Sequence, residues 1–200
     1  MDGKATLPRV ILFEMRALIR GGICASLKDR NFNVVQCYSL EHLTEELCVQ
    51  SGEENVLLIG AGGLGSLVSS VLRTLRFTQT MPLTSIVYFP CQDELLAKLF
   101  IAAGAHHALT EDALEDALEA LICAPALPRK ERVKLSPAEL NVLLDYASGM
   151  DTREVASRRN CNYKTVFTFK RNACVRLDIE TKSGWTTLMS SLGQLTSIYD

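Results

Sequence analysis

Three glycines in the first half of the chain have the spacing of a nucleotide-binding turn. Gly60, Gly62 and Gly65 follow an apolar segment, Val56 to Ile59, and precede an apolar segment with helical periodicity. A strand, a glycine-rich turn and a helix can together cradle the pyrophosphate of a dinucleotide or of ATP. This G-x-G-x-x-G spacing therefore raises the hypothesis of a nucleotide-dependent enzyme.

The surroundings of this turn weigh against that hypothesis. GAGGLG, residues 60–65, also resembles the adenylate-binding turn of ubiquitin-activating-type enzymes. However, it follows the third apolar segment of the chain, whereas the dinucleotide fingerprint normally opens the first βαβ unit. An Asp or Glu that holds the ribose should follow by about 20 residues, yet no acid occurs between Asn55 and Gln92. A nucleotide-binding enzyme stays the alternative.

No other set of residues in the sequence has the spacing of a catalytic or metal-binding site. The seven cysteines include no C-x-x-C pair, and the only adjacent candidate ligands are His106 and His107. Neighbouring residues on a strand point to opposite faces, which makes a shared metal ion unfavourable. We therefore predict no catalytic residue, no metal and no cofactor.

Composition and charge limit the class of protein. Of the 200 residues, 48% are hydrophobic and 22% charged, so the chain can bury a core. No apolar run approaches the roughly 20 residues of a membrane span, and the N-terminus lacks the pattern of a signal peptide, which predicts a cytoplasmic protein. Residues 1–128 carry 9 Lys and Arg against 15 Asp and Glu, whereas residues 129–200 carry 12 against 8. Only the basic second part suits a polyanion.

The order of elements predicts two domains. Apolar runs near 8–14, 32–38, 54–59, 83–89 and 106–110 alternate with helical periodicity near 18–29, 41–50, 64–76, 93–103 and 112–122. Alternating β and α units predict a flavodoxin-like, doubly wound α/β domain over residues 1–124. Residues 125–134 are predicted to be a linker, because they combine prolines with mixed charge. Residues 135–200 are predicted to form an all-α domain.

The predicted helical domain contains a candidate helix-turn-helix. Ser136 and Glu139 have the spacing of a capping box for a helix that ends near Ser148. A short helix at 152–159 precedes the turn 160–162, in which Asn162 can cap a helix from Tyr163 to about 177. A fourth helix is predicted near 183–192.

The helix after Asn162 has one apolar and one polar side. Val166, Ala173 and Leu177 recur at helical spacing and are predicted to face the core. The opposite side presents groups that can reach phosphates, base edges and a thymine methyl, namely Lys164, Phe167, Thr168 and Arg171, with Lys170 on the flank. The alternative is a helical bundle whose basic face is merely solvated.

Anchors across four helices resemble the DNA-binding domain of LuxR/FixJ-type (NarL-type) regulators. They are Ser136-Pro137-x-Glu139, Val142-Leu143, Gly149, Glu154-Val155-Ala156, Lys164-Thr165-Val166 and Leu177. The resemblance implies a four-helix domain whose third helix enters the major groove and whose fourth supports dimerisation. By position, Phe167, Thr168 and Arg171 would contact the groove, with Lys164 and Thr165 near the backbone.

The chain departs from this family at three positions. Arg159 stands where leucine is usual, Phe167 where lysine is frequent and Phe169 where histidine is frequent. Phe167 exchanges a phosphate-seeking charge for an apolar contact, so we expect a shallower salt dependence of DNA binding and a site richer in thymine.

The first half resembles the receiver domain of the same family, without its phosphorylation chemistry. Leu18 to Ile23 preserve the receiver's first helix, but its acid pair becomes Glu14-Met15. The phosphoaccepting aspartate falls on Gly60, the Ser/Thr on Phe89 and the lysine on Glu111. Phosphotransfer needs a carboxylate nucleophile, acids for Mg²⁺, a hydroxyl and an ammonium. We therefore expect a degenerate receiver that is not phosphorylated.

These observations lead to one functional hypothesis. The chain is expected to be a DNA-binding transcription regulator that acts independently of phosphorylation, on double-stranded DNA, as a homodimer or as the accessory subunit of a related regulator. An interaction protein that sequesters regulators without touching DNA is a further alternative.

Overall fold

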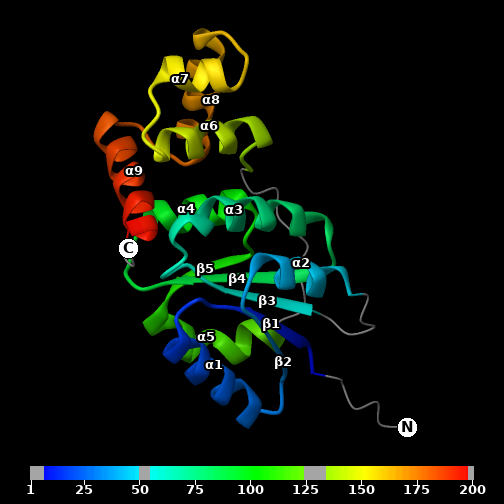
Figure 1. Cartoon of the computed structure of the whole chain (residues 1–200). Helices are drawn as coiled ribbons and strands as arrows, with labels where there is room; N and C mark the ends of the chain where they lie inside the picture. Colours follow the sequence, from blue (N-terminus) through cyan, green and yellow to red (C-terminus); the bar gives the residue numbers. More distant parts are fainter. Residues whose placement is uncertain (1–6, 50–54, 124–133, 198–200) are drawn as a thin grey trace.

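The computed structural model describes residues 7–49, 55–123 and 134–197 (Figure 1). We call residues 7–123 the α/β part and residues 134–197 the helical part. The α/β part contains a parallel sheet of five strands in the order β2-β1-β3-β4-β5. Its strands are β1 (Arg9–Phe13), β2 (Asn33–Cys37), β3 (Asn55–Gly60), β4 (Leu83–Phe89) and β5 (His107–Thr110). This strand order is that of flavodoxin-like folds.

Helices cover both faces of the sheet, as Figure 1 shows. On one face lie α1 (Ala17–Asp29) and α5 (Glu111–Cys123), and on the other α2 (Leu40–Cys48), α3 (Val68–Phe77) and α4 (Glu94–Ala103). Short 3₁₀ turns, η1 (Gly65–Leu67) and η2 (Thr78–Thr80), flank α3. The central strands β1, β3 and β4 are buried almost throughout, because both of their faces are covered.

The helical part contains α6 (Pro137–Ala147), α7 (Thr152–Arg158), α8 (Tyr163–Arg176) and α9 (Lys182–Ser197). Ser136 caps α6 in the predicted capping box: its side chain accepts from the Glu139 N–H at 3.2 Å, while the Ser136 N–H donates to the Glu139 carboxylate at 2.7 Å. Asn162 caps α8 by accepting from the Lys164 N–H at 2.9 Å. Both predicted caps are thus present.

The two parts share an apolar core. The cluster that includes Leu75 and Leu99 of the α/β part continues into Leu140, Leu188 and Leu192 of the helical part. At its border, the Leu135 N–H donates to the Ala102 carbonyl at 3.0 Å, Arg76 donates to the Leu135 carbonyl, and Lys98 pairs with Asp178 at 3.1 Å. Figure 1 shows α9 reaching down beside α4, with α7 and α8 at the far end.

The α/β fold and the order of its elements agree with the predictions. Two helix boundaries differ: α3 begins at Val68 instead of 64 because a 3₁₀ turn precedes it, and α9 runs to Ser197 instead of ending near 192. The predicted linker, 125–134, lies outside the described residues except for Lys134. Within the described ranges, no helix is long and apolar enough to cross a membrane.

Candidate functional site

The positions predicted to form a degenerate phosphorylation site meet at the carboxyl ends of the strands. Gly60 ends β3, Phe89 ends β4, and Glu111 is the first residue of α5, directly after β5. Glu14 and Met15 follow β1, which pairs with β3. The fold therefore brings the predicted set to one edge of the sheet, which we call the carboxyl edge.

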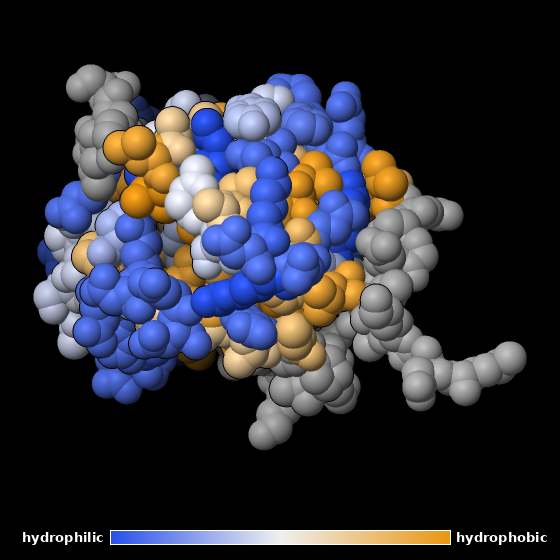
Figure 2. Space-filling model, turned by 90° about the horizontal axis from the view of Figure 1, so that it is seen from below, coloured by the Kyte–Doolittle hydropathy of each residue, from blue (hydrophilic) through white to orange (hydrophobic). Residues whose placement is uncertain are grey.

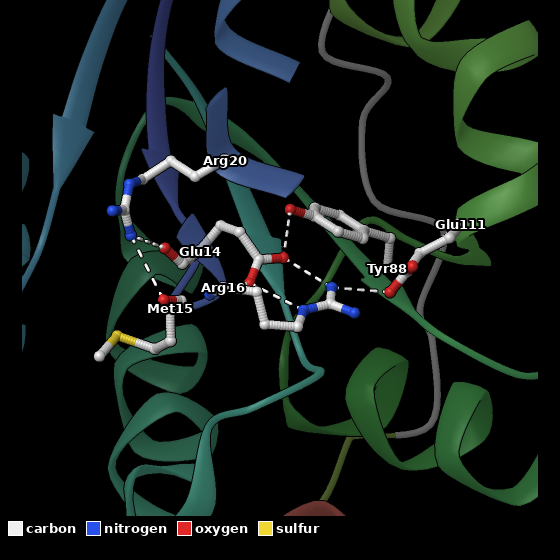
Figure 3. Close-up of polar contacts among 6 residues, drawn as sticks. All are labelled: Glu14, Met15, Arg16, Arg20, Tyr88 and Glu111. Atoms are coloured by element: carbon white, nitrogen blue, oxygen red, sulfur yellow. Dashed lines mark hydrogen bonds and ion pairs between the residues drawn. The ribbon is translucent and has the colours of Figure 1, made fainter. Parts of the chain in front are cut away.

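A buried polar network fills the carboxyl edge (Figure 3). The side chain of Glu14, which is fully buried, accepts hydrogen bonds from the Arg16 N–H at 2.7 Å, from Arg16 Nε at 3.0 Å and from Tyr88 Oη at 2.8 Å. Arg16 Nη2 lies 2.7 Å from Glu14 Oε2 and 2.7 Å from Glu111 Oε1. One guanidinium thus bridges two carboxylates at the edge where the sequence predicts a degenerate phosphorylation site.

The glycines at this edge make room for the network. A Cβ on Gly60 would overlap the Glu14 carboxylate and would lie 2.8 Å from Tyr88 Oη. A Cβ on Gly62 would lie 2.6 Å from Arg16 Cζ. Both distances are shorter than any normal carbon contact, so the glycines permit the buried ion pairs.

The network stabilises the charged form of Arg16. Burial alone would lower the pKa of Arg16, but the hydrogen bonds and negative charges of Glu14 and Glu111 outweigh burial and raise it. Burial and the Glu14 charge raise the pKa of Tyr88, whose hydroxyl therefore stays protonated and donates. Glu14, Arg16 and Tyr88 thus have their hydrogen-bond partners inside the protein.

Arg16 and Tyr88 were absent from the predicted site. Arg16 follows Glu14 by two residues, which is a weak signal in the sequence, whereas nothing in the sequence indicates Tyr88, which lies 74 residues beyond Glu14. Arg20 adds to the edge by donating to the Glu14 carbonyl at 2.7 Å and by lying 4.7 Å from the centre of the Tyr38 ring. Among the described residues, no group of His, Cys, Asp and Glu could hold a metal ion.

The GAGGLG turn differs from a nucleotide cradle in two ways. The Arg16 guanidinium lies against Gly62, where the backbone of a cradle would approach a phosphate. Gly65 begins a 3₁₀ turn of three residues, and the α-helix starts only at Val68. The turn therefore lacks the direct step from glycine to helix N-terminus that binds an anion.

The second candidate site is the exposed side of α8. Val166, Ala173 and Leu177 are buried as predicted, so the opposite side of α8 faces solvent. Five of the six predicted DNA-contacting residues are exposed: Lys164, Thr165, Phe167, Thr168 and Arg171. The Thr168 hydroxyl donates to the Lys164 carbonyl at 3.0 Å, as hydroxyls in helices often do. Their contact with DNA stays a prediction.

The sixth predicted residue, Lys170, is half-buried and packs against two aromatic rings of the helical part. Its Nζ lies 4.7 Å from the ring centre of Tyr146 on α6 and 4.3 Å from that of Trp185 on α9. The two rings are perpendicular, with centres 5.5 Å apart. Burial lowers the pKa of Lys170, and nearby Lys182 lowers it further. Lys170 joins three helices and is less available than the other five residues.

Buried ion pairs position α7 and α8 on α6. Arg159, at the end of α7, donates to both carboxylate oxygens of Asp145 at 2.6 and 2.8 Å. This fork matches the charge of Arg159 with a buried acid, at a position where the LuxR/FixJ-type domains that the sequence resembles usually have leucine. Arg176 at the end of α8 pairs with buried Glu139 at 3.0 Å.

Comparisons with known proteins give structural likeness only. No protein-family model and no curated protein matches the chain. Among solved structures, RcsB of Salmonella enterica serovar Typhimurium bound to the promoter rprA with the phosphomimetic BeF₃⁻ is similar. Its TM-score is 0.55 at 19% identity, and the match covers 92% of this chain and 98% of that one.

Two further structures of RcsB resemble the chain to the same degree. RcsB of the same serovar bound to the promoter P1flhDC has a TM-score of 0.55 at 20% identity, over 93% of this chain and 100% of that one. A structure of two RcsB dimers bound to two parallel DNAs has a TM-score of 0.54 at 20% identity, over 92% and 99%. At such identities the likeness establishes the fold alone: an α/β part with a five-stranded parallel sheet, followed by helices.

Proposed function

We propose that the protein is a DNA-binding transcription regulator whose α/β part acts without phosphorylation. The observation that carries this proposal is that α8 has an exposed side with basic residues, while its opposite side packs into the core of the helical part. The structurally similar RcsB is bound to promoter DNA in its solved complexes, which supports the same role for this chain.

The exposed side of α8 suits a polyanion. The helix carries Lys164, Lys170, Arg171 and Arg176 but no Asp or Glu over residues 163–176. Lys164 lies in the first turn and Arg171 two turns further on, so both can approach one stretch of duplex. Charged and hydroxyl groups with this placement contact phosphates and base edges in the major groove.

The filled carboxyl edge supports independence from phosphorylation. A phosphoaspartate needs a carboxylate where Gly60 stands, and Mg²⁺ needs acids that are free to coordinate. Of the positions that resemble the receiver's functional acids, only Glu14 keeps a carboxylate, and it is bonded to Arg16 and Tyr88. Regulation would then act through abundance, through a small ligand or through a partner protein.

The outer face of α1 and α5 fits a second regulator subunit. Figure 2 views the molecule from this side and shows apolar residues among hydrophilic ones. Leu18 is 91% exposed, and a hollow of about 380 Å³ separates α1 from α5. DNA sites with two half-sites need two recognition helices, and RcsB is solved as DNA-bound dimers. We propose assembly through this face, with a second copy or a related regulator.

Binding of selected duplex DNA at fixed salt tests the DNA-binding proposal. Lys164→Ala is expected to weaken binding of all sequences about equally, whereas Arg171→Ala costs about 1–3 kcal/mol and relaxes sequence preference. Lys28→Ala is the matched control and leaves binding unchanged, because Lys28 is an exposed cation at the end of α1 that does not line the hollow between α1 and α5. Equal affinities of all four proteins would refute the role of α8.

BeF₃⁻ with Mg²⁺ tests phosphorylation independence. We expect no change in melting temperature or in DNA affinity, because Gly60 ends β3 at the position where an aspartate would hold the phosphomimetic. A saturable rise in melting temperature with BeF₃⁻ would show that the edge still binds a phosphoryl group.

A further inference from the structure

Charge alone does not explain the exposed side of α8, which also carries a row of apolar side chains. Tyr163, Phe167 and Val175 are 51%, 53% and 73% exposed, and they recur on one side of the helix at four- and eight-residue spacing. They are three of the eight large apolar residues that are exposed in the described part of the chain. A solvent-facing helix side is normally polar, so a cluster of this kind indicates contact with a ligand.

Tyr163 and Phe167 form a pair. Their rings meet edge to face, with centres 6.4 Å apart and planes at 84°. This arrangement is favourable for aromatic rings and restricts the motion of both. The pair lies in the first two turns of α8, at the end of the molecule that Figure 1 places away from the sheet. We call the Tyr163–Phe167 pair the apolar ridge. It faces solvent, and the α/β part does not obstruct it.

The charges around this ridge point to DNA as its ligand. Lys164 is adjacent to Tyr163 and is exposed, Arg171 follows Phe167 by one turn and is exposed, and α8 contains no acid. A protein partner would need an apolar groove with acidic rims. Duplex DNA offers both features, because phosphates border a major groove in which thymine alone of the four bases presents a methyl group.

We propose that Tyr163 and Phe167 bind the 5-methyl groups of thymines in the major groove, so that the protein selects sites with thymine at these positions. This inference rests on the proposed DNA-binding function and names the bases it prefers. Apolar side chains contact the thymine methyl favourably. Burying one methyl against the ridge corresponds to about a fourfold gain in affinity.

Val175 provides a matched control within the same row. It is the most exposed residue of the three, but it follows Tyr163 by 12 residues. At the rise of an α-helix this is about 18 Å along the axis, which exceeds the roughly 12 Å width of the major groove. Val175 should therefore lie beyond the bases that Tyr163 and Phe167 contact.

The test uses the full chain and duplexes that it selects from a random-sequence library. The best duplex is resynthesised with deoxyuridine in place of each thymine in turn, which removes only the methyl. For the wild type, we expect affinity to fall about fourfold at one or two thymines. In Phe167→Ala the ratio between the thymine and deoxyuridine duplexes is expected to fall to about one at the affected position, while Val175→Ala keeps the wild-type ratio. Circular dichroism confirms that each variant is folded.

The outcomes separate this inference from the proposed function. If wild type binds the selected duplex but tolerates deoxyuridine everywhere, the protein binds DNA and methyl recognition is overturned. If Phe167→Ala keeps the wild-type ratio at every thymine, Phe167 binds no methyl group, and the inference is overturned as well. If the chain selects no duplex at all, both the proposed function and this inference are overturned.

Discussion

At the carboxyl edge of the sheet the ionisable side chains are buried and bonded to one another, whereas along the exposed side of α8 they face solvent. Glu14 is fully buried between Arg16 and Tyr88. Lys164 and Arg171 are exposed. The sequence predicts a functional site at both regions, so their different surroundings in this chain are informative.

The difference lies in what a ligand would have to displace. A phosphate or metal ion at the carboxyl edge would have to break ion pairs between buried side chains. These charged groups already lost their hydration when the protein folded. A duplex on α8 would displace only water and counterions. We therefore expect α8 to bind a ligand and the carboxyl edge to stabilise the fold. The predictions below test this division, from the largest expected effect to the smallest.

Gly60→Asp should have the largest effect. The new side chain would overlap the Glu14 carboxylate and bury a second negative charge beside it. We expect the free energy of unfolding to fall by about 5 kcal/mol, with no gain of phosphorylation by acetyl phosphate. Denaturant unfolding measures the loss. Gly22→Asp on α1, where a Cβ meets nothing within 4 Å, is the control and should change stability by less than about 1 kcal/mol. A stable Gly60→Asp protein that accepts phosphate would contradict the division.

Arg16→Met should cost about 3–5 kcal/mol of folding free energy, because it leaves the buried Glu14 carboxylate without its counter-ion. Glu14→Gln in the same chain removes that charge. The double variant is therefore expected to be more stable than Arg16→Met alone, with a coupling of about 1–3 kcal/mol. Additive losses in chemical denaturation would argue that the ion pair does not organise the edge.

Several of these features were visible in the sequence, because local patterns determine them. The strands follow from continuous apolar runs such as Val56 to Ile59, and the caps at Ser136 and Asn162 follow from short-range spacing. The sequence also located Gly60 at the end of the third strand. It identified that glycine only as a missing aspartate, whereas in the structure it makes room for Glu14.

Features that depend on distant parts of the chain could not be predicted. Tyr88 meets Glu14 only because β4 lies beside β3 in the sheet. Lys170 has the same helical spacing as an exposed residue on the flank of α8, yet Tyr146 and Trp185 approach it from two other helices. A single sequence indicates which residues lie on the buried face of a helix. It does not indicate which neighbouring helix covers the residues at the edge of that face.

Glu139→Gln tests the joint between α6 and α8. Burial by itself would raise the pKa of Glu139, but hydrogen bonds from Ser136 and Arg176 outweigh burial and lower it. A lowered folded-state pKa means that the stabilisation is complete above the ordinary value of 4.5 and is lost as the pH falls through the folded pKa. We expect a loss of about 1–2 kcal/mol at pH 7.

The pH profile of this loss provides its check. In thermal melts, the difference between wild type and Glu139→Gln should shrink as the pH is lowered below 4.5. Glu115→Gln on the exposed side of α5 is the control and should show little difference at any pH. A difference that stays constant with pH would mean that the Glu139 charge contributes nothing to the joint.

Lys170→Met should have the smallest effect on DNA binding, and it tests most directly where the DNA-binding surface of α8 ends. Each cation that neutralises a phosphate adds about 0.9 to the slope of log affinity against log salt. Lys164→Ala should therefore reduce the slope by about 0.9, whereas Lys170→Met should leave it unchanged because Tyr146 and Trp185 hold the ammonium. Methionine keeps the apolar stem, so the lost cation–π contacts are expected to appear as a lower melting temperature. If the slope instead falls by the same amount in both variants, Lys170 leaves its aromatic partners when DNA binds. The DNA-binding surface of α8 would then include Lys170, which its aromatic partners cover in the free protein.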